Sequence, residues 1–144
     1  MRHWLPPIAW MALIFTGSTD SFSSGHTSRL IAPLLRWLFP GLALPTIDLV
    51  VFLVRKAAHL SEYAVLAALW WRALQRPAGA SSRDWSWRAA GLAVLVSALW
   101  AATDEIHQLF TASRGASAWD MLLDTAGAGT GLLLLWALAR WRGR

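Results

Sequence analysis

Two short stretches of the chain gather acidic, basic and imidazole side chains beside long apolar segments. The first stretch carries Arg55, Lys56, His59, Glu62 and Tyr63. The second runs from Thr103 to Asp124, and its polar residues are Asp104, Glu105, His107, Gln108, Arg114, Asp120 and Asp124. Charged groups beside apolar runs are costly unless they are paired or used, so by default they mark a functional site.

General acid–base catalysis is one chemistry that these residue types allow. An imidazole or a carboxylate can serve as general base, and a neighbouring carboxylate can orient the imidazole. We predict these roles for a catalytic set composed of His59, Glu62, Asp104 and Glu105. Because the chain has no serine-nucleophile motif and no P-loop, covalent serine chemistry and ATP hydrolysis are not expected.

Recognition of an anionic group is the second chemistry. Guanidinium and ammonium groups bind phosphate and pyrophosphate well, and three of them accompany the acidic residues. The predicted substrate-binding set consists of Arg55, Lys56, Tyr63, Gln108, Arg114, Asp120 and Asp124. Together the two sets would bind the head group of a membrane lipid or a lipid-linked substrate, with hydrolysis or group transfer there as the catalytic outcome.

Three other interpretations compete with catalysis. A structural ion-pair network would lock the helices together, since buried charges are usually partnered. A divalent cation would offset the excess of acidic over basic groups, but Arg55 and Lys56 would repel it, so no resident metal is predicted. The third interpretation is a non-catalytic binder or flippase-like carrier of a lipid or glycopeptide. Because the chain is small for a carrier, this interpretation predicts a homo-oligomer.

Apolar helices must position these residues. Hydrophobic residues make up 56% of the 144 residues and charged residues only 15%, against about 25% in soluble domains. Four apolar blocks cover roughly residues 4–19, 47–75, 88–110 and 119–140, and crossing a bilayer takes about 20 residues. We therefore predict an all-α membrane protein, a bundle of four transmembrane helices formed by a single domain of residues 1–144.

The segments before residue 47 are less regular. The purely apolar core of the first block runs only from Ile8 to Phe15 after Arg2, which also suits a signal peptide. No A-x-A-like site follows, so a retained helix is predicted. Residues 17–28 are predicted as a polar loop. The segment 29–39, RLIAPLLRWLF, is predicted as a short interfacial amphipathic helix on the outer side, ended by Pro40-Gly41.

Arginine and lysine placement predicts the orientation. With four spans, eight of these residues fall on the side of both termini and five on the other, so both termini are predicted to be cytoplasmic. The arginines flank apolar blocks, which fits membrane topology and not nucleic-acid binding. The chain has no cysteine, so neither disulfides nor thiolate ligands are involved.

Spacing from the cytoplasmic arginines predicts a common depth for the polar residues. Lys56, Asp104 and Asp124 each lie sixteen residues from an arginine of that side, namely Arg72, Arg88 and Arg140. Sixteen helical residues span roughly 24 Å of a core about 30 Å thick. Three helix ends should therefore meet in one polar pocket at the outer leaflet.

Small residues in the last two blocks predict close helix packing. Gly127 and Gly131 form a G-x-x-x-G pair, and the block at 88–110 is rich in alanine.

Three motifs in order resemble those of the VanZ-like family of bacterial membrane proteins. They are K-x-x-H-x-x-E-Y from Lys56, D-E-x-x-Q from Asp104 and R-x-x-S-x-x-D from Arg114, within roughly residues 47–135. The resemblance implies the bacterial cytoplasmic membrane, a lipid-linked cell-wall precursor as a partner and a link to resistance against teicoplanin-type glycopeptides. It implies no settled reaction. The chain has Asp124 where the family commonly has Asn, which adds a negative charge.

Overall fold

Five helices make up the part of the chain that this computed structural model describes, which comprises residues 2–18, 24–75, 85–110 and 117–142. In chain order they are α1 (Leu5–Gly17), α2 (Ser24–Leu38), α3 (Leu44–Gln75), α4 (Trp87–Gln108) and α5 (Ala118–Arg142). These residues contain no strand, so the predicted all-α class is confirmed.

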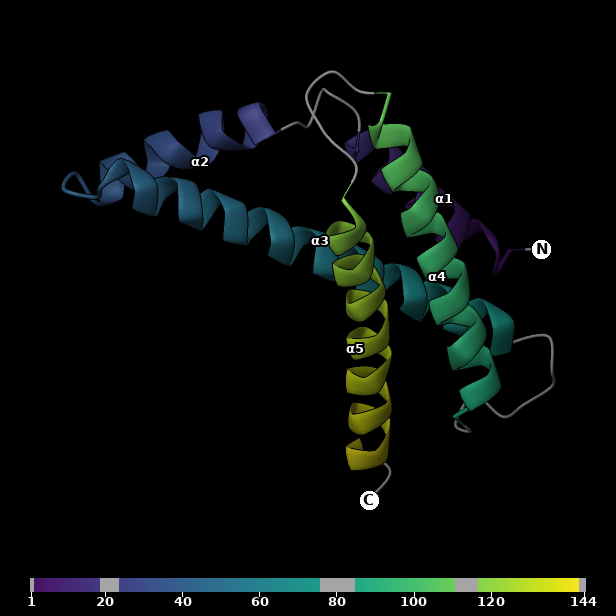
Figure 1. Ribbon diagram of the computed structural model, residues 1–144. Coiled ribbons are helices and arrows are strands. Elements are labelled where there is room, and N and C mark those ends of the chain that lie inside the picture. Colours follow the sequence, from purple (N-terminus) through teal and green to yellow (C-terminus); the bar gives the residue numbers. More distant parts are fainter. Residues whose placement is uncertain (1, 19–23, 76–84, 111–116, 143–144) are drawn as a thin grey trace.

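The longest helix, α3, contacts each of the other four helices. Its 32 residues correspond to roughly 48 Å of helix. Helices α4 and α5 pack on its C-terminal half, and α1 also contacts it, whereas α2 runs back along its N-terminal half (Figure 1). Helices α1, α4 and α5 therefore gather on α3 away from the half that α2 contacts.

Helix α5 crosses α3 at the two glycines of the G-x-x-x-G pair. A Cβ atom on Gly127 would lie 2.6 Å from the backbone oxygen of Leu60, and one on Gly131 would lie 2.6 Å from the Cβ atom of Ala64. Gly129, between them, has nothing within 4 Å of its Cβ position. The spacing of the pair thus corresponds to the face that touches α3, as expected for small-residue packing.

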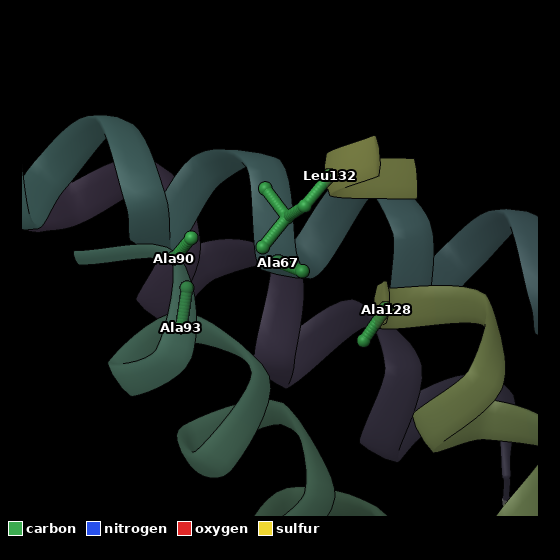
Figure 2. Packing of buried hydrophobic residues seen from close by; sticks show 5 residues of the cluster. All are labelled: Ala67, Ala90, Ala93, Ala128 and Leu132. Carbon is green, nitrogen blue, oxygen red and sulfur yellow. The ribbon is translucent and has the colours of Figure 1, made fainter. Parts of the chain in front are cut away.

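Alanines close the contact among α3, α4 and α5 on the C-terminal side of this crossing. Figure 2 shows Ala67 of α3 with Ala90 and Ala93 of α4 and with Ala128 and Leu132 of α5. Short side chains let the backbones of all three helices approach closely, because no long side chain lies between them. This cluster fixes the helices whose next turns carry the polar residues.

The distribution of polarity is the reverse of that in a soluble protein. Large apolar side chains such as Leu99, Phe110 and Leu134 are exposed, whereas Asp104 and Asp124 are buried. Exposed apolar surface of this extent marks contact with a membrane or a partner. Helices α4 and α5 are each long and apolar enough to cross a membrane.

A bundle of four crossing helices remains a prediction. Helix α1 has 13 residues, roughly 20 Å, which is less than the thickness of a bilayer core. Helix α3 is long enough, but it carries Arg55, Lys56 and Glu62 in its middle. The predicted block at 88–110 corresponds to α4 and the block at 119–140 to α5, with ends that differ by one or two residues.

Helix α2 corrects the prediction for the segment before α3. It begins at Ser24, so the predicted polar loop of residues 17–28 was wrong for its last five residues. Serine favours helix N-termini, where its hydroxyl can serve unpaired backbone N–H groups, so a polar first turn does not prevent a helix. The predicted end is confirmed, because α2 stops at Leu38, immediately before the turn at Pro40 and Gly41.

Candidate functional site

Two contacts join the middle of α3 to the first turns of α5. The Lys56 amine donates to Oδ1 of Asp120 over 2.5 Å. One turn further along both helices, His59 Nδ1 lies 3.6 Å from Oδ1 of Asp124, a distance that suits charge pairing more than a hydrogen bond. Because the side chain of Asp124 is only 3% exposed, its carboxyl group is held away from water.

Asp104 joins α4 to α1. Its Oδ2 atom accepts a 2.6 Å hydrogen bond from the hydroxyl of Ser18 and a 3.2 Å bond from the amide of Gln108, one turn along α4. All three residues are buried. Two donors on one oxygen stabilise a carboxylate that water does not reach.

Glu105 holds the start of α5. Its Oε2 atom accepts the backbone N–H of Ser117 over 2.6 Å, immediately before the helix. An acidic group that accepts from the backbone at a helix N-terminus also interacts favourably with the helix dipole. Two neighbouring acidic residues of α4 thus bind different elements: Asp104 binds the end of α1, and Glu105 binds the start of α5.

Buried oxygens without partners lie among these contacts. Within the described residues, the hydroxyl of Tyr63 and the Oδ1 atoms of Asp104 and Asp124 have no hydrogen-bond partner. Tyr63 is 0% exposed and interacts electrostatically with both aspartates. Buried oxygens that lack partners are uncommon in folded proteins, and they point to a bound polar group or water.

The structure brings most of the predicted site residues together. Lys56, His59, Glu62 and Tyr63 of α3, Asp104, Glu105 and Gln108 of α4, and Asp120 and Asp124 of α5 all lie around the meeting of the three helices. Arg55 is half-buried on α3 next to Lys56. Arg114 lies outside the described residues.

Contacts from α1 were missing from the sequence prediction. Besides the bond from Ser18, the indole of Trp10 donates to the backbone oxygen of Glu62 over 2.9 Å. The Phe15 ring lies 4.4 Å from the ring of His107. The only signal for Ser18 is its place as one of the first polar residues after the apolar run, and that signal does not name its partner.

An apolar pocket of about 610 Å³ adjoins this polar site. It is lined by Ile8, Met11, Ala12, Phe15, Thr16, Trp70 and Trp100. These residues come from α1, α3 and α4, and almost all are apolar. The volume falls within the roughly 300–1,000 Å³ that is typical of ligand sites. Phe15 of this lining also contacts the ring of His107, which lies on α4 between Asp104 and Gln108 in the sequence.

The acidic groups of the site are mostly engaged by groups of the chain itself. Among the described residues, no group of three or more His, Asp or Glu side chains is placed to hold a metal. The carboxylates instead bind amines, hydroxyls and backbone N–H groups of the chain itself. An imidazole paired with a buried carboxylate, as in His59 and Asp124, is an arrangement that can accept and return a proton.

Comparison with known proteins gives the family. No curated protein and no solved structure matches the chain significantly. The model of the VanZ/LLP1 family matches residues 4–140, which includes every helix that bears on the site. Together with the two apolar helices, this match indicates a membrane protein. The chain therefore belongs to the VanZ/LLP1 family.

Proposed function

We propose that the protein binds an anionic lipid or a lipid-linked cell-wall precursor at the outer leaflet of the bacterial cytoplasmic membrane. The head group occupies the polar site, and part of the hydrocarbon chain occupies the apolar pocket. One observation carries the proposal: Phe15 of α1 lines the pocket and contacts His107, and Ser18, immediately after α1, donates to Asp104. An apolar cavity beside buried polar groups matches the two halves of a lipid.

Basic groups make an anionic head group the fitting ligand. Lys56 has three donors and, among the described residues, donates one hydrogen bond, to Asp120, so it can hold a phosphate oxygen as well. Arg114 lies in the sequence between α4 and α5, whose ends form the site, and it is the second phosphate ligand that we propose. A guanidinium binds phosphate in a bidentate manner, which a lysine cannot reproduce.

Chemistry at the head group is a further part of the proposal. His59 is the general base, and its facing carboxylate is Asp124, whereas the sequence had suggested Asp104 or Glu105 for that role. Glu62 lies one turn along α3 and remains the alternative base. Family membership makes resistance to teicoplanin-type glycopeptides the phenotype in which the activity is to be sought.

A structural network is the competing function, and specific contacts favour it. The Lys56–Asp120 pair and the Ser18–Asp104 bond each connect two helices, as a purely structural site requires. The unpartnered oxygens of Tyr63, Asp104 and Asp124 favour a ligand instead, since a structural network has no reason to leave them unsatisfied.

Native mass spectrometry of the purified protein with a polyprenyl phosphate tests the proposal. Ala12→Trp should fill the apolar pocket, because Ala12 lines it and is exposed. Lys56→Ala should remove a phosphate ligand. Both variants should bind the lipid less well than the wild type. The control is Ala126→Trp, which places the same side chain on an exposed position of α5 away from the pocket.

The pattern across the variants decides the outcome. Loss in Ala12→Trp and Lys56→Ala with normal binding in Ala126→Trp supports the two-part site. Equal binding in all four proteins would show that neither the pocket nor the polar site holds the lipid.

A further inference from the structure

A second, smaller pocket lies at the opposite end of α1 from the polar site. It has a volume of about 130 Å³ and is lined by Arg2, His3, Pro6, Leu69 and Arg72. The 13 residues of α1 separate it from Ser18 by roughly 20 Å of helix. No residue of this pocket belongs to the proposed lipid site, so the two sites are independent.

The wall of this pocket is basic. Among the described residues, Arg2, His3 and Arg72 line it, and no Asp or Glu does. Within the described residues, neither Arg2 nor Arg72 forms a salt bridge. Guanidinium groups bind phosphate through charge-assisted hydrogen bonds, so this wall suits an anionic ligand.

The size of the pocket restricts the anion. A volume of about 130 Å³ is well below the roughly 300–1,000 Å³ of a site that encloses a whole small molecule. It suits a single phosphate group, which arginine binds through paired N–H donors. Pro6 and Pro7, in the first turn of α1, have no N–H to offer, so the side chains must supply the donors.

Two tryptophans lie next to pocket residues in the sequence. Trp4 follows His3, Trp70 precedes Arg72 by two residues, and the two rings are 5.6 Å apart. Tryptophan is enriched at membrane–water interfaces. Basic pockets between membrane helices at that level bind the head groups of acidic lipids.

We propose that Arg2, His3 and Arg72 form a phosphate-binding site that holds the head group of an anionic phospholipid where α1 begins. A free phosphate or soluble phosphate ester has the same recognition chemistry. The lipid is the favoured source, because the tryptophans and the exposed apolar surface keep this end of the helices at the interface.

The test measures binding to the full-length protein in detergent by native mass spectrometry. The probes are phosphatidylglycerol, phosphatidylcholine and inorganic phosphate. The wild type should bind phosphatidylglycerol more tightly than phosphatidylcholine. Arg2→Gln combined with Arg72→Gln should weaken phosphatidylglycerol binding about tenfold or more, since the proposed site loses both guanidinium ligands of the phosphate.

Two further variants separate this site from general surface charge and from misfolding. Arg140→Gln with Arg142→Gln removes the same charge from the exposed end of α5 and should leave binding unchanged. Pro6→Glu keeps both arginines but puts a carboxylate on the pocket wall, so it should also prevent binding. An acidic residue in the first turn favours the helix, so this variant should fold.

The outcomes are distinct. If inorganic phosphate binds but phosphatidylglycerol does not, and phosphate binding depends on Arg2 and Arg72, the site binds a soluble phosphate. That result would confirm a phosphate site and exclude the lipid as its ligand. Phosphatidylglycerol binding that is equal in the wild type, the Arg2/Arg72 variant and Pro6→Glu overturns the proposal. So does an equal loss in the Arg140/Arg142 control.

Discussion

The amine of Lys56 and the carboxylate of Asp120 are 2.5 Å apart and connect the middle of α3 with the first turn of α5. Their side chains are 25% and 33% exposed, so water screens the pair only in part. The position of Asp120 at the start of a helix adds a favourable interaction with the helix dipole. The pair lies where a lipid head group would bind, so it can serve structure, recognition or both.

Removing both partners separates structure from recognition. Lys56→Met leaves Asp120 without its amine and should lower the free energy of unfolding by about 1–2 kcal/mol, between the values for exposed and buried pairs. Lys56→Met with Asp120→Leu should recover most of that loss, because no unpaired charge remains. Thermal unfolding in detergent measures both effects. If the double variant is folded and still binds polyprenyl phosphate as the wild type does, the proposed head-group site is wrong.

The glycines of α5 should differ sharply in their tolerance of a methyl group. Gly127→Ala directs its new Cβ at the backbone oxygen of Leu60, which cannot rotate away, so α5 must shift. We expect a loss of about 1–3 kcal/mol in the free energy of unfolding, as for other overpacked contacts. Gly129→Ala is the matched control; it meets nothing and should be neutral or stabilising by up to about 1 kcal/mol. Equal stability of the two variants would contradict the described crossing.

Ser18→Ala should destabilise the protein although serine and alanine are similar in size. The substitution removes the 2.6 Å hydrogen bond to a buried carboxylate and should cost about 1–3 kcal/mol. Ser61→Ala removes only an exposed bond to Ala57 on the same helix and should have little effect. Unfolding of both variants in one detergent gives the comparison. A neutral Ser18→Ala would mean that α1 is not held through Asp104.

The orientation in the membrane can be tested with single cysteines, since the chain has none of its own. A cysteine at Gly115 should react with an impermeant thiol reagent from outside intact cells, and one at Ala80 should not. Both positions lie outside the described residues, so the expectation rests on the distribution of arginine and lysine. The reverse labelling pattern would place the polar site at the inner leaflet.

Hydropathy was sufficient to predict where most of the helices lie. The apolar block at 88–110 became α4 because a long apolar run flanked by polar segments has few alternatives to a helix in a membrane. The same reasoning located α5 and the C-terminal end of α3. The prediction from hydropathy failed at residues 24–28. Their composition resembles that of a loop, but they form the start of α2.

Individual pairings could not be read from the sequence. Depth along the helices brought Lys56, Asp104 and Asp124 to a similar level. It did not identify the carboxylate that meets Lys56, which is Asp120, one turn before Asp124 on α5. Close packing at Gly127 and Gly131 sets the rotation of α5. The contacts of α1 depend in turn on this arrangement, which explains why Ser18 was missed.

Tyr63 is the only tyrosine of the chain; it is fully buried and interacts electrostatically with Asp104 and Asp124. Biosynthetic replacement with 3-fluorotyrosine would therefore produce a protein with one fluorine resonance, free of overlap from other tyrosines. The chemical shift of that resonance depends on the polar groups and solvent around the ring. Titration with lipids would then report occupancy of the site by fluorine NMR in the unmutated protein.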